Sequence, residues 1–289
     1  MRSRVVLIMC GLLVAGSAFA AGDAKAPKKA AKAAKPAASA QAQTLFALTP
    51  EMSQKLASND ETQIRGALDD IRLAGKAAAP ATPAITKLLA HGVSSGLAEA
   101  ACDTLGDMES ADATPAIVPY ASHRDPKVRR AAVKALTKTK GEGATAALRK
   151  SLADSDAVVR GFAATGLGSL KAKDAVPDLL DALEHKIAES ATSIGQLCSP
   201  QECETFMGKL GRLPFDVMTG GFDQMLFRPD TEMNDDAKVK IVGRIRELGT
   251  TEANKFMRDV QSRWPGRWSK RVKQAIDQAV LATGGGGGL

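Results

Sequence analysis

Three histidines occupy equivalent positions in a repeating pattern, and such a row is a natural place to look for a metal site. Each histidine follows a proline by eight residues: Pro83 and His91, Pro115 and His123, Pro177 and His185. Helical pairs that stack on one another lie about 10 Å apart, whereas zinc holds its nitrogen ligands at about 2 Å. We therefore predict no metal site here and expect each histidine to complete carbonyl groups at a helix C-terminus.

Two cysteines have the spacing of a local crosslink. Cys198 and Cys203 flank the sequence SPQE, a predicted turn between two helices. In an oxidising compartment we expect a disulfide across this turn. The CxxxxC spacing differs from the CxxC of redox enzymes, so we do not expect redox catalysis. Cys102 lies where other repeats place Ala or Val, and we expect it to be a buried small residue.

The C-terminal region concentrates bases and tryptophans. Residues 255–273 contain seven Lys or Arg residues against one acid, and the motif RWPGRW holds Arg263, Trp264, Arg267 and Trp268. Arginine and tryptophan together suit an anionic partner through charge and cation–π contact. The alternative, which we favour, is a terminal cap in which the tryptophans cover the apolar edge of the last repeat.

The sequence shows no catalytic constellation. It lacks a Gly-rich phosphate loop, GxSxG, HExxH and a paired Cys/His nucleophile motif. One tyrosine and three histidines leave few general acid–base groups other than carboxylates. We predict a protein that is not an enzyme and that needs no cofactor or metal.

The N-terminal region predicts export. Residues 1–20 combine two arginines, an apolar run and a small-residue AFA site, which is typical of a signal peptide. Residues 21–44 are rich in Ala, Lys and Pro and predict a disordered linker. We expect a secreted or periplasmic bacterial protein with no transmembrane span, because the apolar run is shorter than the roughly 20 residues needed to cross a bilayer.

The basic character of the chain comes mostly from this region. The formal charge is +7, and the two arginines of the signal peptide with the five lysines and one aspartate of the linker account for six of these charges. The folded part is therefore close to neutral, which argues against a nucleic-acid partner.

The rest of the chain is organised by an internal repeat. Pro83, Pro115 and Pro177 are 32 and 62 residues apart, which is one and two steps of a repeat of 31 to 32. Four runs of the form acid-x-x-aliphatic-base share this register, and they begin at Glu61, Asp125, Asp156 and Asp236. The acid predicts a helix N-terminus, the later Gly a left-handed helix end, and the Pro the first turn of a second helix.

These units resemble the HEAT family, in particular its short phycobilisome-lyase-like repeats. The resemblance is carried by DPKVRRAAVKAL and by DSDAVVRGFAATGLGSL followed by DAVPDLLDAL; it covers residues 55–210 well and 236–282 loosely. It implies an all-α, right-handed α-solenoid of about six or seven helical hairpins that serves mostly as a protein-binding scaffold. HEAT-like hydroxylases carry His-Glu pairs, and no histidine here precedes Glu, so a hydroxylase or lyase is disfavoured.

The repeat register also predicts which residues face outward. The positions two and six residues after each Pro, or after its equivalent Ala146, are nearly all aliphatic and predict core. The position four residues after it holds Lys87, Pro119, Lys150 and Asp181, which predicts an exposed ridge of mixed charge. We take Lys87, Lys150 and Asp181 as candidate partner-binding residues, together with the Arg and Trp residues of RWPGRW.

The register breaks after the regular repeats. We divide the chain beyond the linker into regular repeats (45–210), a degenerate junction (211–235), a divergent C-terminal repeat and cap (236–283) and a flexible Gly tail (284–289). In the junction, Phe215, Met218, Phe222 and Met225 follow helical spacing. Their face predicts core packing, with a ligand groove as the alternative.

The function we expect is that of an exported scaffold that binds another protein in the cell envelope. The alternative is a binder of an anionic envelope polymer or lipid, through the Lys-rich linker and the C-terminal Arg/Trp segment. The identity of the protein partner does not follow from the sequence.

Overall fold

The computed structural model describes residues 46–284. The predicted signal peptide (1–20) and linker (21–44) lie outside these residues. Most of the predicted Gly tail lies outside them too, although its first residue, Gly284, still belongs to the last helix.

The described residues form helices and turns, with no β-strand. The α-helices are α1 (Pro50–Leu56), α2 (Glu61–Ala74), α3 (Thr82–Ala90), α4 (Ser95–Met108), α5 (Thr114–Ile117), α6 (Pro126–Thr139), α7 (Ala144–Ser151), α8 (Ala157–Ser169), α9 (Val176–Glu184), α10 (Ala188–Leu197), α11 (Pro200–Met207), α12 (Phe215–Leu226), α13 (Asp235–Glu247), α14 (Thr251–Arg263) and α15 (Lys270–Gly284). The 3-10 helices are η1 (Gly75–Ala81), η2 (Ala111–Ala113), η3 (Val118–Ser122) and η4 (Lys173–Ala175).

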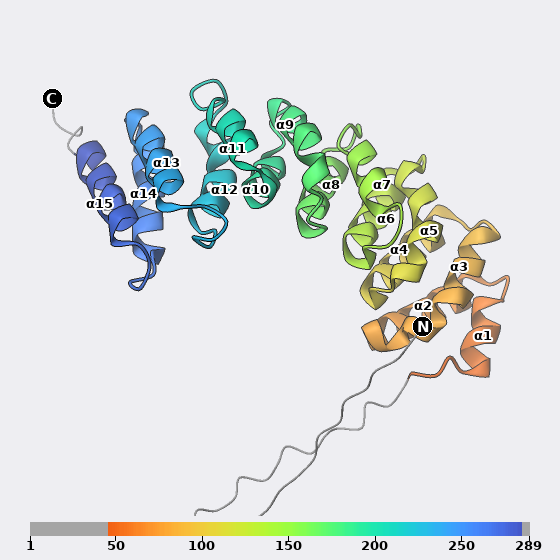
Figure 1. Ribbon diagram of the computed structural model, residues 1–289. Coiled ribbons are helices and arrows are strands. Elements are labelled where there is room, and N and C mark those ends of the chain that lie inside the picture. Colours follow the sequence, from red (N-terminus) through yellow and green to blue (C-terminus); the bar gives the residue numbers. More distant parts are fainter. Residues whose placement is uncertain (1–45, 285–289) are drawn as a thin grey trace, which may run out of the picture. The chain divides into compact units, whose positions relative to one another are not determined.

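The helices stack in two layers that follow chain order (Figure 1). In the first layer α2, α4, α6, α8, α10, α12 and α14 pack each against the next. The second layer holds the odd-numbered helices from α3 to α15, and α1 packs against α2 and α3 at the N-terminal end. Pairs from α2–α3 to α14–α15 thus form seven hairpins among the described residues. The structure confirms the predicted all-α solenoid.

Helix starts follow the predicted chemistry with small shifts. Asp125 and Asp156 cap α6 and α8 by accepting hydrogen bonds from backbone N–H groups two residues on. At α2 the cap is Asp60, one residue before the predicted Glu61. At α13 the cap is Asn234, and Asp236 lies in the first turn.

The helix α13 also corrects the predicted register. The run that begins at Asp236 was expected to open the first helix of a hairpin, yet α13 packs against α15 in the second layer. The hairpins at this end are therefore α12–α13 and α14–α15, and the predicted boundary at residue 235 divides the first of them. Acids near the first turn suit helices of both layers equally, so the pattern alone does not distinguish them.

Arginine side chains connect neighbouring turns in the regular repeats. Arg129 forms a paired contact with Asp154, at 2.8 Å from both Nε and Nη2, and its Nη1 donates to the His123 carbonyl at 3.0 Å. Arg160, one repeat later, donates from Nη1 to the Asp154 carbonyl at 2.8 Å. In these two of the four acid-x-x-aliphatic-base runs, the base closes the turn that precedes its own helix; Arg65 and Lys240 contact other hairpins instead.

Asp156 combines the cap of α8 with an ion pair across repeats. Its carboxylate accepts from Arg130 Nε at 3.0 Å and from the backbone N–H of Val158 at 2.9 Å. Hydrogen bonding from Arg130, with that from the helix N–H groups, lowers the pKa of Asp156 to about 2.

This lowered pKa predicts acid sensitivity that Asp156→Asn removes. Because the folded pKa lies below the usual value of about 3.9, the charge stabilises the fold above pH 4 and ceases to do so as the pH falls through 2. Asn still caps a helix. The wild type should be more stable than Asp156→Asn at pH 5 in urea unfolding, and the difference should shrink between pH 4 and pH 2. A difference that stays constant over that range would contradict this account.

Close contact between first-layer helices depends on small residues. A Cβ atom on Gly106 in α4 would lie 2.9 Å from the Ala135 Cα in α6. Gly195 in α10 and Gly221 in α12 touch backbone to backbone, with no room for a side chain on either. Gly195 lies inside α10, where α10 crosses α12.

Gly195→Ala should destabilise the protein, because a methyl group would meet the Gly221 carbonyl. We expect a loss of about 1–3 kcal/mol in the free energy of unfolding, which is the usual cost of overpacking. Gly243→Ala is the matched control: it also lies inside a helix, α13, and its added Cβ meets nothing within 4 Å. That variant should be neutral or more stable by up to about 1 kcal/mol, since Ala favours helix. Equal effects in urea unfolding would refute the packing explanation.

The predicted junction helix exists as α12, and its face is core. Phe222, Met218 and Met225 are fully buried. The Phe222 ring meets Phe206 edge-on at 5.1 Å and stacks on Phe215 at 6.1 Å between centroids. Of the two alternatives, core packing is confirmed for this face.

Candidate partner-binding groove

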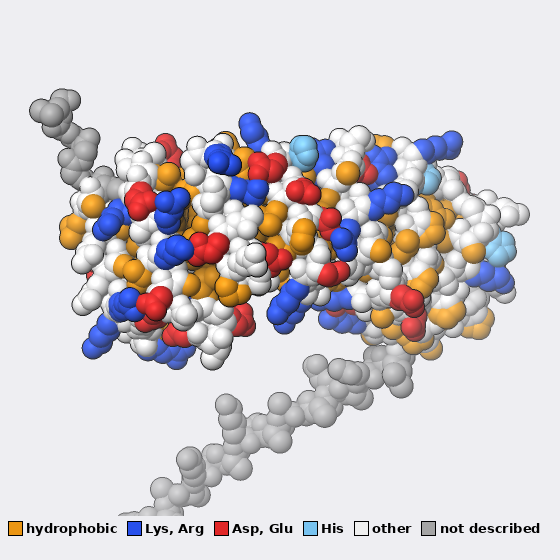
Figure 2. All heavy atoms as spheres, turned by 45° about the horizontal axis from the view of Figure 1, so that its top comes forward, with side chains coloured by type: hydrophobic (Ala, Val, Ile, Leu, Met, Phe, Trp, Pro, Cys, Tyr) orange, Lys and Arg blue, Asp and Glu red, His pale blue; other side chains and the backbone are white. Residues whose placement is uncertain are grey.

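The second layer exposes the ridge that the repeat predicts. Lys87 on α3, Pro119 in η3, Lys150 on α7 and Asp181 on α9 are all exposed. The aliphatic rows on either side of it are buried; they consist of Ile85, Leu89, Ile117, Ala121, Leu148, Leu152, Leu179 and Leu183. This layer therefore separates a buried apolar side from a polar surface, on which acidic and basic side chains are interspersed (Figure 2).

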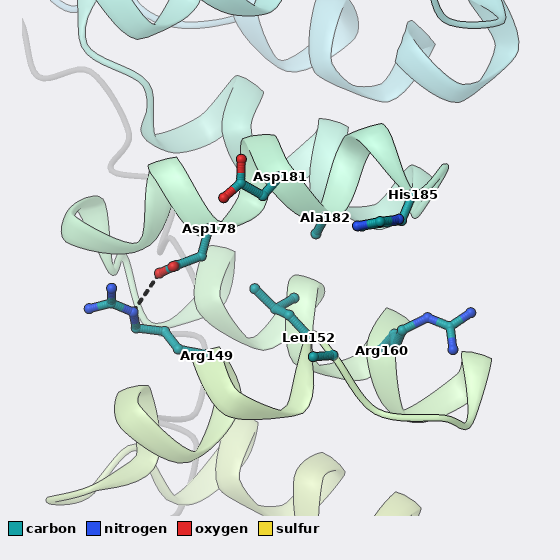
Figure 3. Close-up of a pocket in the computed structure, with 8 residues that line it drawn as sticks. Arg149, Leu152, Arg160, Asp178, Asp181, Ala182 and His185 are labelled. Carbon is teal, nitrogen blue, oxygen red and sulfur yellow. Dashed lines mark hydrogen bonds and ion pairs between the residues drawn. The ribbon is translucent and has the colours of Figure 1, made fainter.

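A cavity of about 610 Å³ opens between α7, α9 and the start of α8. Basic and acidic side chains form its walls, and small or aliphatic ones form its floor (Figure 3). The lining residues are Arg149, Leu152, Ala153, Arg160, Asp178, Asp181, Ala182 and His185. We call this cavity the α7–α9 groove.

Most charges of the α7–α9 groove are held in place. Arg149 Nε donates to Asp178 Oδ2 at 2.5 Å, the contact dashed in Figure 3. The Arg160 guanidinium is committed to the carbonyls of Asp154 and Ser155. The groove thus has a fixed wall of paired charges.

Two charges at the groove are not committed. Asp181, on its α9 wall, and Lys150, next to Arg149 on α7, form no ion pair within residues 46–284. Leu152 and Ala182, 8% and 4% exposed, supply the apolar floor between the helices. An apolar floor with free charges of both signs suits a segment of another protein that carries complementary charges.

The three histidines do not share one role. His91 ends α3, and its Nδ1 lies 2.8 Å from the Lys87 carbonyl, as expected for a helix C-terminus. His123 differs, because its Nδ1 accepts from the backbone N–H of Asp125 at the start of α6. His185 follows α9 and lines the α7–α9 groove. No group of three or more His, Cys, Asp or Glu side chains in residues 46–284 is placed to hold a metal ion.

The predicted cysteine pair forms a disulfide bond, with the Cα atoms of Cys198 and Cys203 5.3 Å apart. The SPQE segment is not a turn, however: Ser199 caps α11 and residues 200–202 form its first turn, so the bond joins the end of α10 to α11. Cys102 is fully buried, and burial raises the pKa of its thiol to about 12. Such a thiol is inert near neutral pH.

The C-terminal tryptophans form a packed cluster. Trp264 is 7% exposed and meets Trp268 edge-on at 5.2 Å, and both rings pack on Phe227 at 5.7 and 5.9 Å. Arg263 lies over the Phe227 ring at 4.7 Å and pairs with Asp223 and Asp259. Of the four candidates in RWPGRW, only Arg267 is an exposed charge without an ion pair among the described residues.

Two bases near this cluster are buried, which the sequence did not predict. Lys238 in α13 is fully buried, donates to Asp230 Oδ1 and the Arg228 carbonyl at 2.7 Å each, and lies 5.1 Å from the Trp268 ring. Arg228, 9% exposed, donates from Nε to the Gly195 carbonyl at 2.8 Å and from Nη1 to the Cys198 carbonyl at 2.9 Å. The sequence feature that could have indicated a buried Arg228 is its position as the single base in the apolar and aromatic stretch MLFRPD.

A two-layer stack of short helical hairpins is the architecture of an α-solenoid. Residues 82–161 match the family model of HEAT repeats, and residues 159–185 match that of the PBS lyase HEAT-like repeat. The chain contains HEAT repeats, as the sequence predicted.

Solved structures with a similar fold are helical-repeat proteins. The complex of CpcE and CpcF of phycocyanin lyase from Nostoc sp. PCC7120 is 18% identical, with a TM-score of 0.44 over 86% of this chain and 100% of that chain. A designed armadillo repeat protein is 16% identical, with a TM-score of 0.42 over 81% of this chain and 99% of that one. At these values the likeness concerns the helical-repeat fold alone. None of the curated proteins matches this chain.

Within residues 46–284, no helix combines the length and the apolar character that a membrane crossing requires.

Proposed function

We propose that this protein is an exported, non-enzymatic HEAT-repeat scaffold that binds another protein in the cell envelope. The observation that carries the proposal is the α7–α9 groove, whose apolar floor is bordered by the unpaired Asp181, with the unpaired Lys150 exposed beside the wall residue Arg149. The N-terminal signal-like sequence supports export, and HEAT repeats are commonly used as extended binding surfaces.

The groove suits recognition by charge pattern. Its paired charges, such as Arg149 with Asp178, hold the walls in one arrangement before a partner arrives. Preformed walls lower the ordering cost of binding. Lys150 and Asp181 then provide one free charge of each sign, so a partner segment is selected by the order of its charges.

The test reverses these two charges together. Lys150→Glu with Asp181→Lys leaves the net charge unchanged but inverts the pattern at the groove. Crosslinking and pull-down from the native envelope should recover about tenfold less of the partner with this variant, which corresponds to about 1.4 kcal/mol of binding free energy.

The matched control is a second charge swap away from the groove. Lys127→Glu with Asp69→Lys exchanges two exposed residues without ion pairs in the described chain, on first-layer helices α6 and α2. It should recover the partner at the wild-type level. Equal recovery by both swaps would exclude the groove as the binding surface.

A second candidate function is favoured by the separation of charge along the chain. Residues 235–284 contain 11 Lys or Arg and 6 Asp or Glu, whereas residues 46–234 contain 21 and 25. Four bases within residues 251–284 are exposed and form no ion pair among the described residues: Lys255, Arg258, Arg267 and Lys270. Such a surface suits an anionic polymer or lipid. The tryptophans do not support this function, because they are packed into the cap.

Replacing these four bases with Gln tests the second candidate. Binding to vesicles that contain phosphatidylglycerol should be weaker for the variant than for the wild type, and the wild-type binding should fall as salt is raised from 50 to 300 mM, because exposed charges are screened. Pure phosphatidylcholine vesicles are the control. Equal binding of both proteins to the anionic vesicles would exclude this surface.

A further inference from the structure

A second cavity lies where the C-terminal ends of three first-layer helices meet. It measures about 1000 Å³ and is bordered by the ends of α8, α10 and α12 and by the disulfide-linked start of α11. The side chains that matter to its chemistry are Lys171, Lys173, Gln196, Gln224, Arg228 and Glu232. We call it the α8–α12 cavity; it is separate from the α7–α9 groove.

Arg228 is a buried cation in the wall of this cavity that lacks a bonded counter-ion. Its donors reach the carbonyls of Gly195 and Cys198, and Nη2 lies 3.6 Å from the Cys198 sulfur. It forms no ion pair with any carboxylate in residues 46–284, whereas its buried neighbour Lys238 is paired with Asp230. Burial lowers the pKa of Arg228, so its charge is incompletely compensated by the dipoles around it.

Three acids line the cavity, and one of them is held in an ion pair outside it. Asp174 pairs with Arg149 at 3.4 Å, outside the cavity lining. Glu202 accepts from the backbone N–H of Ser199 at 2.8 Å in the cap of α11. The remaining acid, Glu232, is exposed, and its charge acts on Arg228 without a hydrogen bond between them.

The basic side chains at the rim of the cavity are not held in ion pairs. Lys171 and Lys173, in the turn between α8 and α9, form no ion pair within the described residues. The amides of Gln196 and Gln224, which contact each other at 3.4 Å, add further donors. The cavity therefore offers three cations and amide donors against two carboxylates that form no ion pair, Glu202 and Glu232, of which only Glu232 has no hydrogen bond of its own.

We propose that the α8–α12 cavity binds an acidic side chain of a partner protein, with Arg228 as the buried contact and Lys171 and Lys173 at the rim. This deepens the proposed function, because it rests on the chain binding a protein. A guanidinium presents donors in a planar fork that matches a carboxylate, and the incoming carboxylate would supply the counter-charge that the fold leaves out. Glu232 then acts as an internal competitor for the same cations.

If Glu232 competes with an incoming carboxylate for these cations, removing its charge should strengthen binding of an acidic peptide. The probe is a blocked hexaglutamate peptide, measured by calorimetry at 50 mM salt with the full chain. Glu232→Gln, at an exposed residue, should bind the peptide at least threefold more tightly than the wild type. Lys171→Gln with Lys173→Gln should bind it about tenfold more weakly. A blocked hexaglutamine peptide should show no binding to any of the three proteins.

A spectroscopic readout locates the binding at Arg228. The arginine Nε–Hε resonance that disappears in Arg228→Lys should shift in the wild type as hexaglutamate is added. If Arg228→Lys does not fold, assignment through the neighbouring residues of the wild type replaces it. Binding that leaves this resonance in place would overturn the proposal, and so would an affinity that is the same in the wild type and Glu232→Gln.

Two further variants separate this site from the other surfaces. The Lys150/Asp181 charge swap should bind hexaglutamate as the wild type does, so failure of the groove to bind a partner would leave this result standing. Loss of peptide binding in the variant that lacks the four C-terminal bases, with no loss in Lys171→Gln/Lys173→Gln, would assign the peptide to the C-terminal surface and overturn the proposal.

Discussion

The close approach of first-layer helices is the contact on which the rest of this structure depends. A single hairpin cannot bury both of its apolar stripes, so its stability comes from the neighbour on each side. At α4 against α6, and again at α10 against α12, the helices approach until Gly106, Gly195 and Gly221 leave no space for a side chain. The small residues at these crossings are therefore a packing requirement, even though Gly weakens an isolated helix by about 1 kcal/mol.

Close stacking has a consequence for polar groups. When helices approach this closely, the turns between them are brought together as well, and their carbonyls must be satisfied. Arg129 and Arg160 meet this need within regular repeats by donating to carbonyls of the preceding turn. At the irregular junction Arg228 does the same for the end of α10, but from the turn after α12 and from a buried position. The junction thus also uses an arginine to satisfy turn carbonyls. Burying this charge costs more desolvation free energy than leaving it at the surface does.

The parts of the fold that depend on local chemistry could be predicted from the sequence, and those that depend on distant contacts could not. Pro83, Pro115 and Pro177 mark second helices because a missing N–H matters only to the helix that contains it. In contrast, the role of Gly195 is decided by Gly221, which lies one hairpin later. The layer of α13 is decided by its packing on α15. Of the candidate site, the sequence predicted the exposed ridge but not the groove or the buried Arg228, since both arise where separate repeats meet.

The two buried cations of the junction show how a scaffold can separate stability from binding. Lys238 has a carboxylate, a carbonyl and two indole rings as partners, so its charge is compensated and its role is structural. Arg228 has carbonyl groups and a sulfur atom, which orient its guanidinium without neutralising it. A buried charge held in place by dipoles gains more from an added carboxylate than a solvated one does, because the surrounding medium screens it less. The same burial that makes Arg228 costly to the fold therefore favours contact with a carboxylate, as we propose for the α8–α12 cavity.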